Sequence, residues 1–414
     1  MPGRILVDTT PLRESRDFRL LFTGQLISML GTQLTVVAIP YQVYSMTHSS
    51  LQVGAISLAQ LVPFLAGALS AGPVGDAVDR RRIMVWTAAG SALTSAGLAV
   101  NAAVAHPSLP ALYLISSLAA GLMGFSSTAR MASVPSLVER RHFSAAAAMM
   151  QIIIQVGTVV GPALSGILLT VGLPLVYGLD SASFVVALVA SLMLRPIPPA
   201  AGAQGLSLRR STAEGLHYLR SHQVLQGVYL IDINAMVFGM PRALFPAMAG
   251  SVFGGGTVAL GFLYAAPGVG ALVGAVTTGW VSNVRRQGWA VVVAVSVWGA
   301  TIACFGLVDT LWLGLFLLAV AGWADVISAV LRNTILQSTV PERFRSRMSS
   351  IQMAVVQGGP RLGDMESGTV AALTSVEFSV VSGGLASIAG AVIISALLPA
   401  FRHYLAAHAD DAPV

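Results

Sequence analysis

Long apolar stretches separated by short polar connections run along the whole chain. Each stretch holds about 20 residues or more, which as a helix crosses a hydrocarbon core of about 30 Å. Backbone groups in lipid must be hydrogen-bonded within their own segment, so we expect helices. The pattern predicts an all-α membrane protein with twelve transmembrane helices, at 19–46, 51–75, 83–105, 110–133, 143–170, 175–194, 224–249, 258–282, 289–308, 311–337, 347–373 and 377–400.

Among the connections between these helices, arginine occurs only in alternate ones. The connections near 47–50, 106–109, 171–174, 250–257, 309–310 and 374–376 contain none, and the chain has no lysine. Basic residues accumulate on the cytoplasmic side of membrane proteins, so both termini are expected in the cytoplasm. A chain rich in Ala, Arg, Gly and Val is typical of a GC-rich bacterium. We therefore expect a multi-pass protein of a bacterial cytoplasmic (inner) membrane.

Composition excludes several classes of function. The chain is 55% hydrophobic and 10% charged, with a mean hydropathy of +0.78, which argues against a soluble protein. The excess of basic residues is explained by topology, so nucleic-acid binding is not expected. Without lysine there is no phosphate-binding loop for ATP, and the seven histidines form no metal-ligand or nucleophile–base pattern. We expect neither an enzyme nor a bound cofactor or metal.

A linker divides the chain into two similar halves. Residues 195–223 open with a Pro/Ala/Gly run and continue into a short amphipathic helix, leaving six predicted helices in 1–194 and six in 224–414. Four positions of the second helix recur in the eighth at an offset of 207 residues: Gly54, Gly67, Gly72 and Asp76 match Gly261, Gly274, Gly279 and Asn283. Two pseudo-symmetric six-helix bundles with a substrate site between them form a known transporter architecture.

The connection after the second helix reads GPVGDAVDRRR over residues 72–82. It resembles the loop pattern G-x-x-x-D-[RK]-x-G-[RK]-[RK] of the major facilitator superfamily, through Gly72, Asp76, Arg80 and Arg81. Ala77 and Asp79 depart from it, where a basic residue and a glycine are usual. The resemblance implies that Asp76 faces helix 347–373 and helps to close the cytoplasmic side, with Gly279 and Asn283 as counterparts. The alternative is that the arginines serve topology alone.

A second pattern lies in the fifth helix, which reads GTVVGPALSG over residues 157–166. Gly157, Gly161, Pro162 and Gly166 match a motif of exporters in this superfamily, and Ser165 replaces one glycine. Small residues four apart let helices approach closely, and proline bends a helix. The resemblance implies a sealed pathway and export; ordinary helix packing is the alternative.

Ionisable groups inside membrane helices cost about 2.5–3.5 kcal/mol each on insertion scales, so they are candidates for function. Asp325 lies near the middle of its helix, where it would exchange protons from the central cavity or make a structural hydrogen bond. Arg332 shares its face but lies about 10 Å away along the axis, too far for a direct pair. Asp180 is interpreted as structural, and Arg130 lies near the cytoplasmic end of its helix.

Five further charges complete the candidate set. Arg361 and Asp364 are three residues apart and can pair within their helix, whereas Glu366 lines the pathway or faces the outer surface. Asp232 and Arg242 lie on one side of the seventh helix, about 15 Å apart. Prolines flank Arg242, so freed carbonyls beside this cation would suit an anionic or catecholate substrate; a pair with an acid on a neighbouring helix is the alternative.

Residues 41–57, 240–249, 261–274 and 331–350 resemble the enterobactin (siderophore) exporter branch of the superfamily. The resemblance implies a monomeric secondary transporter that exports a small organic molecule, a siderophore, by proton-coupled alternating access as an antiporter. Its partners would be the substrate, protons and the lipid bilayer. The alternatives are a broad-specificity (multidrug) exporter, a nutrient importer or a non-transporting membrane receptor. Helix 110–133 lacks the central arginine usual in proton-coupled exporters, so coupling would depend on the intramembrane acids.

Overall fold

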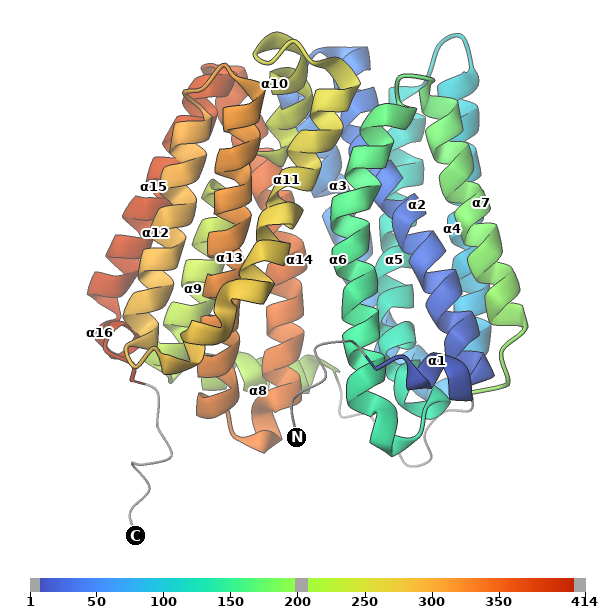
Figure 1. The fold of residues 1–414 in the computed structure, drawn as a ribbon, viewed down its shortest axis with the longest axis horizontal. Coiled ribbons are helices and arrows are strands. Elements are labelled where there is room, and N and C mark those ends of the chain that lie inside the picture. The colour runs from blue at the N-terminus through green and yellow to red at the C-terminus, as the bar shows by residue number, and fades with distance from the viewer. Residues whose placement is uncertain (1–7, 198–207, 406–414) are drawn as a thin grey trace. The chain divides into compact units, whose positions relative to one another are not determined.

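The computed structural model describes residues 8–197 and 208–405, and all regular secondary structure in these ranges is helical (Figure 1). The first half contains α1 (Thr10–Glu14), α2 (Arg16–Thr47), α3 (Ser50–Ala77), α4 (Arg80–Ala103), α5 (Leu109–Leu137), η1 (Arg140–His142), α6 (Phe143–Leu168) and α7 (Leu173–Leu192). The linker contributes α8 (Leu208–Arg220). The remaining elements are α9 (Gln223–Phe238), η2 (Arg242–Leu244), α10 (Phe245–Ser251), α11 (Gly256–Thr277), η3 (Thr278–Asn283), α12 (Gln287–Phe305), α13 (Leu311–Thr339), α14 (Glu342–Leu373), α15 (Val376–Leu397) and α16 (Pro399–Arg402).

Polar residues set where several of these helices begin. The side chains of Asp79, Ser108 and Ser375 accept a hydrogen bond from a backbone N–H in the first turn of α4, α5 and α15, respectively. These N–H groups have no partner inside the helix, so a side-chain oxygen at the N-cap stabilises the start by about 1 kcal/mol. The short connections between the helices therefore carry their own stop and start signals.

Eleven segments within the described residues are long and apolar enough to cross a membrane. They match eleven of the twelve predicted spans. The predicted helix 347–373 lies in α14, which has 32 residues but carries Arg361, Asp364 and Glu366 as well as a charged first turn. These charges lower the mean hydropathy of α14, although its length is ample for a twelfth span.

The predicted helix 224–249 is not continuous. It divides into α9, the 3₁₀ turn η2 and α10, with the break between Phe238 and Arg242. Pro241 cannot donate a backbone hydrogen bond and excludes the preceding residue from helical conformation, which explains the break. The predicted helix 258–282 likewise ends in a 3₁₀ segment, η3.

The chain forms two compact units. Unit 1 comprises Met1–Met46, Ala59–Gly205 and Leu260–Ala265, and unit 2 comprises Thr47–Leu58, Leu206–Ala259 and Ala266–Val414. In unit 1, α4 packs along α5 and α7; in unit 2, α12 packs along α13 and α15. Most of each unit comes from one half of the sequence, and each takes a short segment from the other half.

Large apolar side chains lie both inside and outside the helix packing. Unit 2 has a buried cluster around Ile231, Val295 and Leu331, and unit 1 has one around Phe18 and Met149. Other apolar side chains are strongly exposed, including Leu93 at 74% and Val276 at 87%. Exposed apolar surface of this extent is expected where lipid is the solvent.

Candidate functional site

A buried ion-pair cluster joins α9 and α13 in unit 2. Arg332 Nη2 lies 2.9 Å from Asp232 Oδ1 and 3.9 Å from Asp325 Oδ1, and Arg332 Nη1 donates a hydrogen bond to Ser328 Oγ at 2.9 Å. The side chains of Arg332 and Asp232 are 6% and 4% exposed, whereas that of Asp325 is 32% exposed. Asp232 is thus the close counter-ion of Arg332, and Asp325 is the more distant and more accessible acid.

This geometry corrects the expectation that Asp325 and Arg332 are too far apart to pair. Their Cα atoms are separated by two helical turns, about 10 Å. Helical side chains, however, tilt toward the N-terminus, and an arginine side chain is long enough to reach back along its own helix. The guanidinium group therefore bridges the acid on its own helix and the acid on α9.

A second cluster is centred on Asp364 of α14, which is 9% exposed. Its carboxylate lies in the field of the Arg242 and Arg361 guanidinium groups and accepts hydrogen bonds from the Ser57 hydroxyl and the Ala243 backbone N–H. The turn η2 packs against α14 and brings Arg242 and Ala243 there. In a continuous helix the Ala243 N–H would bond within the helix, so the break also leaves this N–H available to Asp364. The structure therefore brings two cations and one anion together in unit 2.

The structure separates Asp232 and Arg242, which the sequence places on one side of the same predicted helix. Asp232 pairs with Arg332, while Arg242 faces Asp364, so the two candidates on the seventh span belong to different clusters. Glu366 is half-buried and is not among the groups around Asp364.

Sequence reasoning overlooked three polar groups in these clusters: Ser328, Ser57 and the Ala243 N–H. Ser328 lies one turn before Arg332 on the same face, and this spacing is a signal that identifies it. Ser57 and Asp364 are far apart in the chain, so no local pattern relates them. The Ala243 N–H becomes available only because the helix breaks.

The glycines of the fifth-helix pattern allow α6 to approach α2 in unit 1. A Cβ atom at Gly157 would lie 2.6 Å from Met29 Cγ, and one at Gly161 would collide with Gln33 Cβ, so both are too close for carbon atoms. Ser165, which replaces a glycine of the pattern, donates a hydrogen bond from Oγ to the Leu34 carbonyl at 2.8 Å. This departure from the pattern therefore adds an interhelical bond at the same contact.

The predicted repeat relates two more glycine contacts. In unit 2, a Cβ at Gly54 would lie 2.9 Å from Met365 Cα of α14. In unit 1, a Cβ at its counterpart Gly261 would lie 2.6 Å from the Pro162 carbonyl oxygen and 2.7 Å from Gly166 Cα, both of α6. Backbone-to-backbone approach of this kind is possible only without a side chain.

A second repeat pair behaves in the same way. Gly67 packs against the backbone of α5, and its counterpart Gly274 packs against α13 around Val326. Since α5 and α13 are the fourth spans of their halves, the internal repeat relates equivalent helix–helix contacts as well as matching residue types.

The connection at 72–82 has mainly structural contacts in the described part of the chain. Asp79 Oδ1 accepts hydrogen bonds from the backbone N–H groups of Arg81 at 2.8 Å and Ile197 at 3.1 Å. The Arg81 guanidinium donates to carbonyls at the end of α7. Asp79, an outlier from the family pattern, is therefore a helix cap that also fastens the segment after α7.

The structure describes fewer contacts for the remaining residues of the predicted gating loop. Gly72 and Asp76 lie in the last turns of α3, but their surroundings fall outside the described residues. Arg80 donates its backbone N–H to the Ile197 carbonyl at 3.1 Å. Gly279 and the exposed Asn283 lie in η3. Gating by Asp76 therefore stays a prediction.

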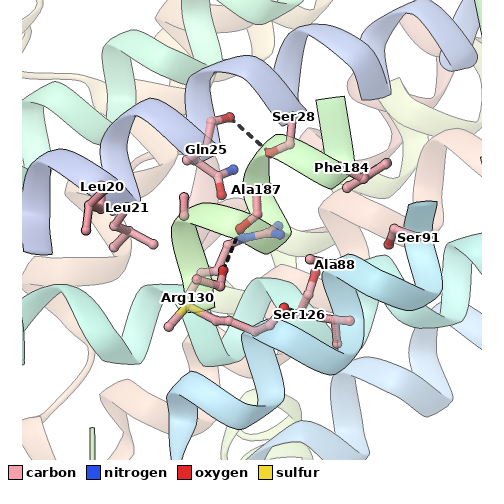
Figure 2. A pocket seen from close by; sticks show the side chains of 15 residues that line it. Leu20, Leu21, Gln25, Ser28, Ala88, Ser91, Ser126, Arg130, Phe184 and Ala187 are labelled. Carbon is pink, nitrogen blue, oxygen red and sulfur yellow. Dashed lines mark hydrogen bonds between the residues drawn. The ribbon is translucent and has the colours of Figure 1, made fainter. Parts of the chain in front are cut away.

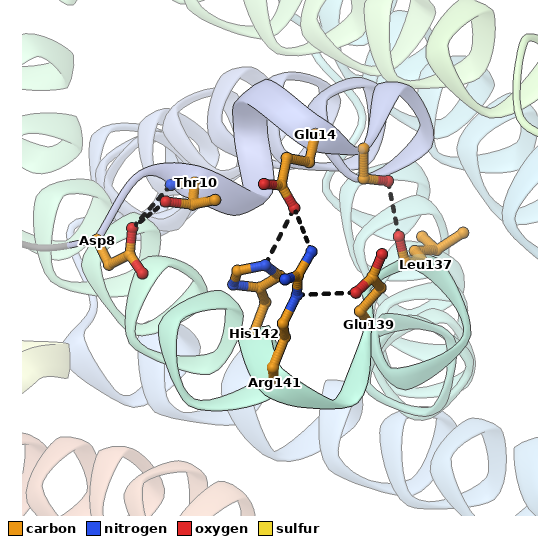
Figure 3. A network of polar contacts seen from close by, with 8 residues as sticks. Asp8, Thr10, Glu14, Leu137, Glu139, Arg141 and His142 are labelled. Atoms are coloured by element: carbon orange, nitrogen blue, oxygen red, sulfur yellow. Dashed lines mark hydrogen bonds and ion pairs between the residues drawn. The ribbon is translucent and has the colours of Figure 1, made fainter.

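An ion-pair network lies where α1 meets the start of α6 (Figure 3). Glu14 Oε2 lies 3.0 Å from His142 Nε2 and 3.4 Å from Arg141 Nη2, and Arg141 Nε lies 2.8 Å from Glu139 Oε2. The Arg141, Glu139 and Glu14 side chains are half or more exposed. Such exposed pairs contribute about 1 kcal/mol or less each, so this network fastens α1 only weakly.

Comparison with known proteins places this architecture in a family. The family described as transmembrane secretion effector (MFS_3) matches residues 8–410. The chain is 29% identical over 401 residues to the enterobactin exporter EntS of Escherichia coli K12, covering 96% of each chain. It is 31% identical over 396 residues to EntS of Citrobacter koseri, covering 95% of this chain and 93% of that one.

Solved transporter structures share the fold. A mutant of the nucleoside transporter NupG superposes with a TM-score of 0.77 at 11% identity, covering 92% of this chain and 100% of that chain. A bacterial homologue of the human lysosomal transporter Spinster superposes with a TM-score of 0.72 at 14% identity, covering 95% and 97%. The predicted all-α fold of twelve membrane helices is thereby confirmed. The chain belongs to the major facilitator superfamily, in its transmembrane secretion effector family, and is a membrane transporter and not an enzyme.

Proposed function

We propose that this protein exports a siderophore across a bacterial cytoplasmic membrane by proton-coupled alternating access. The observation that carries the proposal is the similarity to proteins named enterobactin exporters, which extends over 96% of both chains. A likeness of this length includes both halves of the chain. It favours a common type of substrate over a shared fold alone.

The Asp364 cluster supports an anionic substrate. Arg242 and Arg361 bring two positive charges close to the Asp364 carboxylate. Guanidinium groups form charge-assisted, bidentate hydrogen bonds to planar oxygen pairs. The adjacent oxygens of a catecholate or a carboxylate have this arrangement. We assign Arg242 and Arg361 to substrate binding, with Asp364 holding them in place.

The Asp325 cluster supports proton coupling. With both acids ionised, the set Asp232, Arg332 and Asp325 carries one net negative charge. A proton on Asp325 makes the set neutral and leaves the close Asp232–Arg332 pair intact. Asp325 is the accessible member, at 32% exposure, so we assign the transported proton to it. Charge neutralisation lowers the cost of moving the site through a low-dielectric environment.

An iron-limited deletion strain tests the substrate. Complementation with the wild-type gene restores siderophore to the medium, whereas the empty vector leaves it inside the cells. Unchanged secretion in the deletion strain together with altered drug sensitivity would refute siderophore export and favour a broad-specificity drug exporter.

Inverted vesicles test the coupling. Asp325→Asn is expected to abolish uptake of the siderophore driven by a pH gradient, while downhill exchange of the same molecule continues. Asp309→Asn is the matched control, because Asp309 is an exposed acid in the connection between α12 and α13. Gradient-driven uptake at the wild-type rate in Asp325→Asn would exclude this acid as the proton carrier.

The proposed arrangement in the membrane has both termini in the cytoplasm and the protein acting as a monomer. Its two bundles are 1–194 and 224–414, joined by the linker 195–223. Reporter fusions at each terminus and light scattering of the purified protein test these assignments; a periplasmic terminus or a dimer mass would contradict them.

A further inference from the structure

Unit 1 contains a buried acid that the proposed transport cycle has not used. Asp180 of α7 is 1% exposed. Its Oδ2 atom accepts hydrogen bonds from Thr35 Oγ1 of α2 and Ser95 Oγ of α4, both at 2.7 Å. Its Oδ1 atom has no hydrogen-bond partner among the described residues. Oδ2 thus accepts two hydrogen bonds, whereas Oδ1 accepts none from the described residues.

The neighbour of the second oxygen is the hydroxyl group of Ser183. A Cβ atom at Gly31 of α2 would lie 2.7 Å from Asp180 Oδ1 and would collide with Ser183 Oγ, so both atoms lie against Gly31. The Ser183 hydroxyl already donates its hydrogen to the Asp180 backbone carbonyl at 2.7 Å. A hydroxyl has one hydrogen, so Ser183 donates either to this carbonyl or to the ionised carboxylate, but not to both. While it donates to the carbonyl, a hydrogen bond at Oδ1 needs a proton on the carboxyl group itself.

Among the described residues, charged side chains near Asp180 do not supply a counter-ion. In α2 and α4 the charged residues lie at the ends that carry Arg16 and Arg80, and α6 has none. Within α7, the Tyr177 hydroxyl donates to Gln42 Oε1 at 2.8 Å. An ionised carboxylate buried without a cation is costly, whereas a protonated one is a neutral hydrogen-bonding group.

A cavity of unit 1 lies among the helices that carry the Asp180 group (Figure 2). It lies between α2, α4, α5 and α7, with Ser28, Ser91 and Phe184 in its wall. Ser91 and Phe184 are one helical turn, about 5.4 Å, from Ser95 and Asp180, whereas Ser28 is two turns from Thr35. Gln25, Ser126 and Arg130 line the same cavity. The positive charge of Arg130 opposes entry of a metal cation into this cavity.

We propose that Asp180, held by Thr35, Ser95 and Ser183, is a second proton-binding site. The inference rests on the proposed proton coupling and adds a site in the N-terminal half to Asp325 in the C-terminal half. The step is a reversible protonation: a proton from the aqueous phase bonds to Oδ1, and the Ser183 oxygen accepts its hydrogen bond. Release reverses both changes.

Infrared spectroscopy of the purified protein in lipid tests the site without a substrate. The carbonyl stretch of a protonated carboxylic acid is expected to be present in the wild type, to shift in heavy water and to disappear at alkaline pH. Asp180→Asn removes this component, and the exposed control Asp309→Asn retains it. Thr35→Val deletes one donor to Asp180 and is expected to change the pH at which the component disappears. This variant replaces Asp180→Asn in the test if Asp180→Asn does not fold.

Three results would overturn the proposal. The first is a component that neither exchanges in heavy water nor titrates, which would indicate a permanently neutral structural acid. The second is stoichiometric binding of radioactive sodium that Asp180→Asn abolishes, which would assign the site to a metal cation. The third is wild-type gradient-driven transport by a folded Asp180→Asn variant. The spectra need no substrate, so failure of siderophore export alone leaves them informative.

Discussion

Removing Arg332 is the perturbation whose effect follows most directly from the structure. Arg332 is the close partner of Asp232, with 2.9 Å between Nη2 and Oδ1 and both side chains almost completely buried. Arg332→Gln keeps a polar side chain but deletes the positive charge. Asp232 would then be an anion on α9 without a cation in contact.

The expected loss of stability is large. Breaking a buried ion pair by deleting one partner costs about 3–5 kcal/mol, because the other charge stays buried and unpaired. For a folding unit of about 200 residues this corresponds to a decrease in Tm of about 10 °C. The double variant Asp232→Asn with Arg332→Gln removes both charges and is expected to recover most of this loss.

Thermal denaturation in detergent, followed by size-exclusion chromatography, measures these shifts. Arg345→Gln is the matched control, since Arg345 is an exposed arginine whose contact with Glu342 is 3.7 Å long. It is expected to keep the wild-type Tm. The reasoning would be refuted by an Arg332→Gln variant within about 2 °C of wild type, or by a double variant no more stable than the single one.

Three further predictions use the same stability assay or a transport assay. Gly261→Val is expected to stop transport while the protein still reaches the membrane, because the new side chain meets the backbone at Pro162; rates at the wild-type level would contradict the close approach. Asp79→Ala is expected to lower stability by about 1 kcal/mol through loss of the α4 cap, and an unchanged Tm would count against that role. Glu214→Gln breaks the 2.8 Å contact with Arg347, but Glu214 is 40% exposed, so a Tm decrease above about 3 °C would show that this pair matters more than surface pairs do.

Much of the membrane architecture follows from local patterns. The apolar runs predicted the spans because the thickness of the hydrocarbon core sets a minimum helix length. The repeat at an offset of 207 residues correctly related positions with the same packing role, as Gly54 and Gly261 show. The pattern was less informative at α14, where charged residues lower the hydropathy of a long helix, and at Pro241, where one predicted span divides.

The pairing of the charges required the tertiary structure. Helical periodicity says which face a residue occupies on its own helix, but not which neighbouring helix that face meets. Asp232 and Arg332 are 100 residues apart in the chain, and their contact depends on how α9 packs against α13. The same limit hid the Asp180 group, whose donors come from α2 and α4. The sequence alone showed that the protein lies in lipid, where its membrane-spanning segments are and which ionisable residues lie within them, because these features depend on local composition. The structure decided which charges neutralise one another, because that depends on distances across helices.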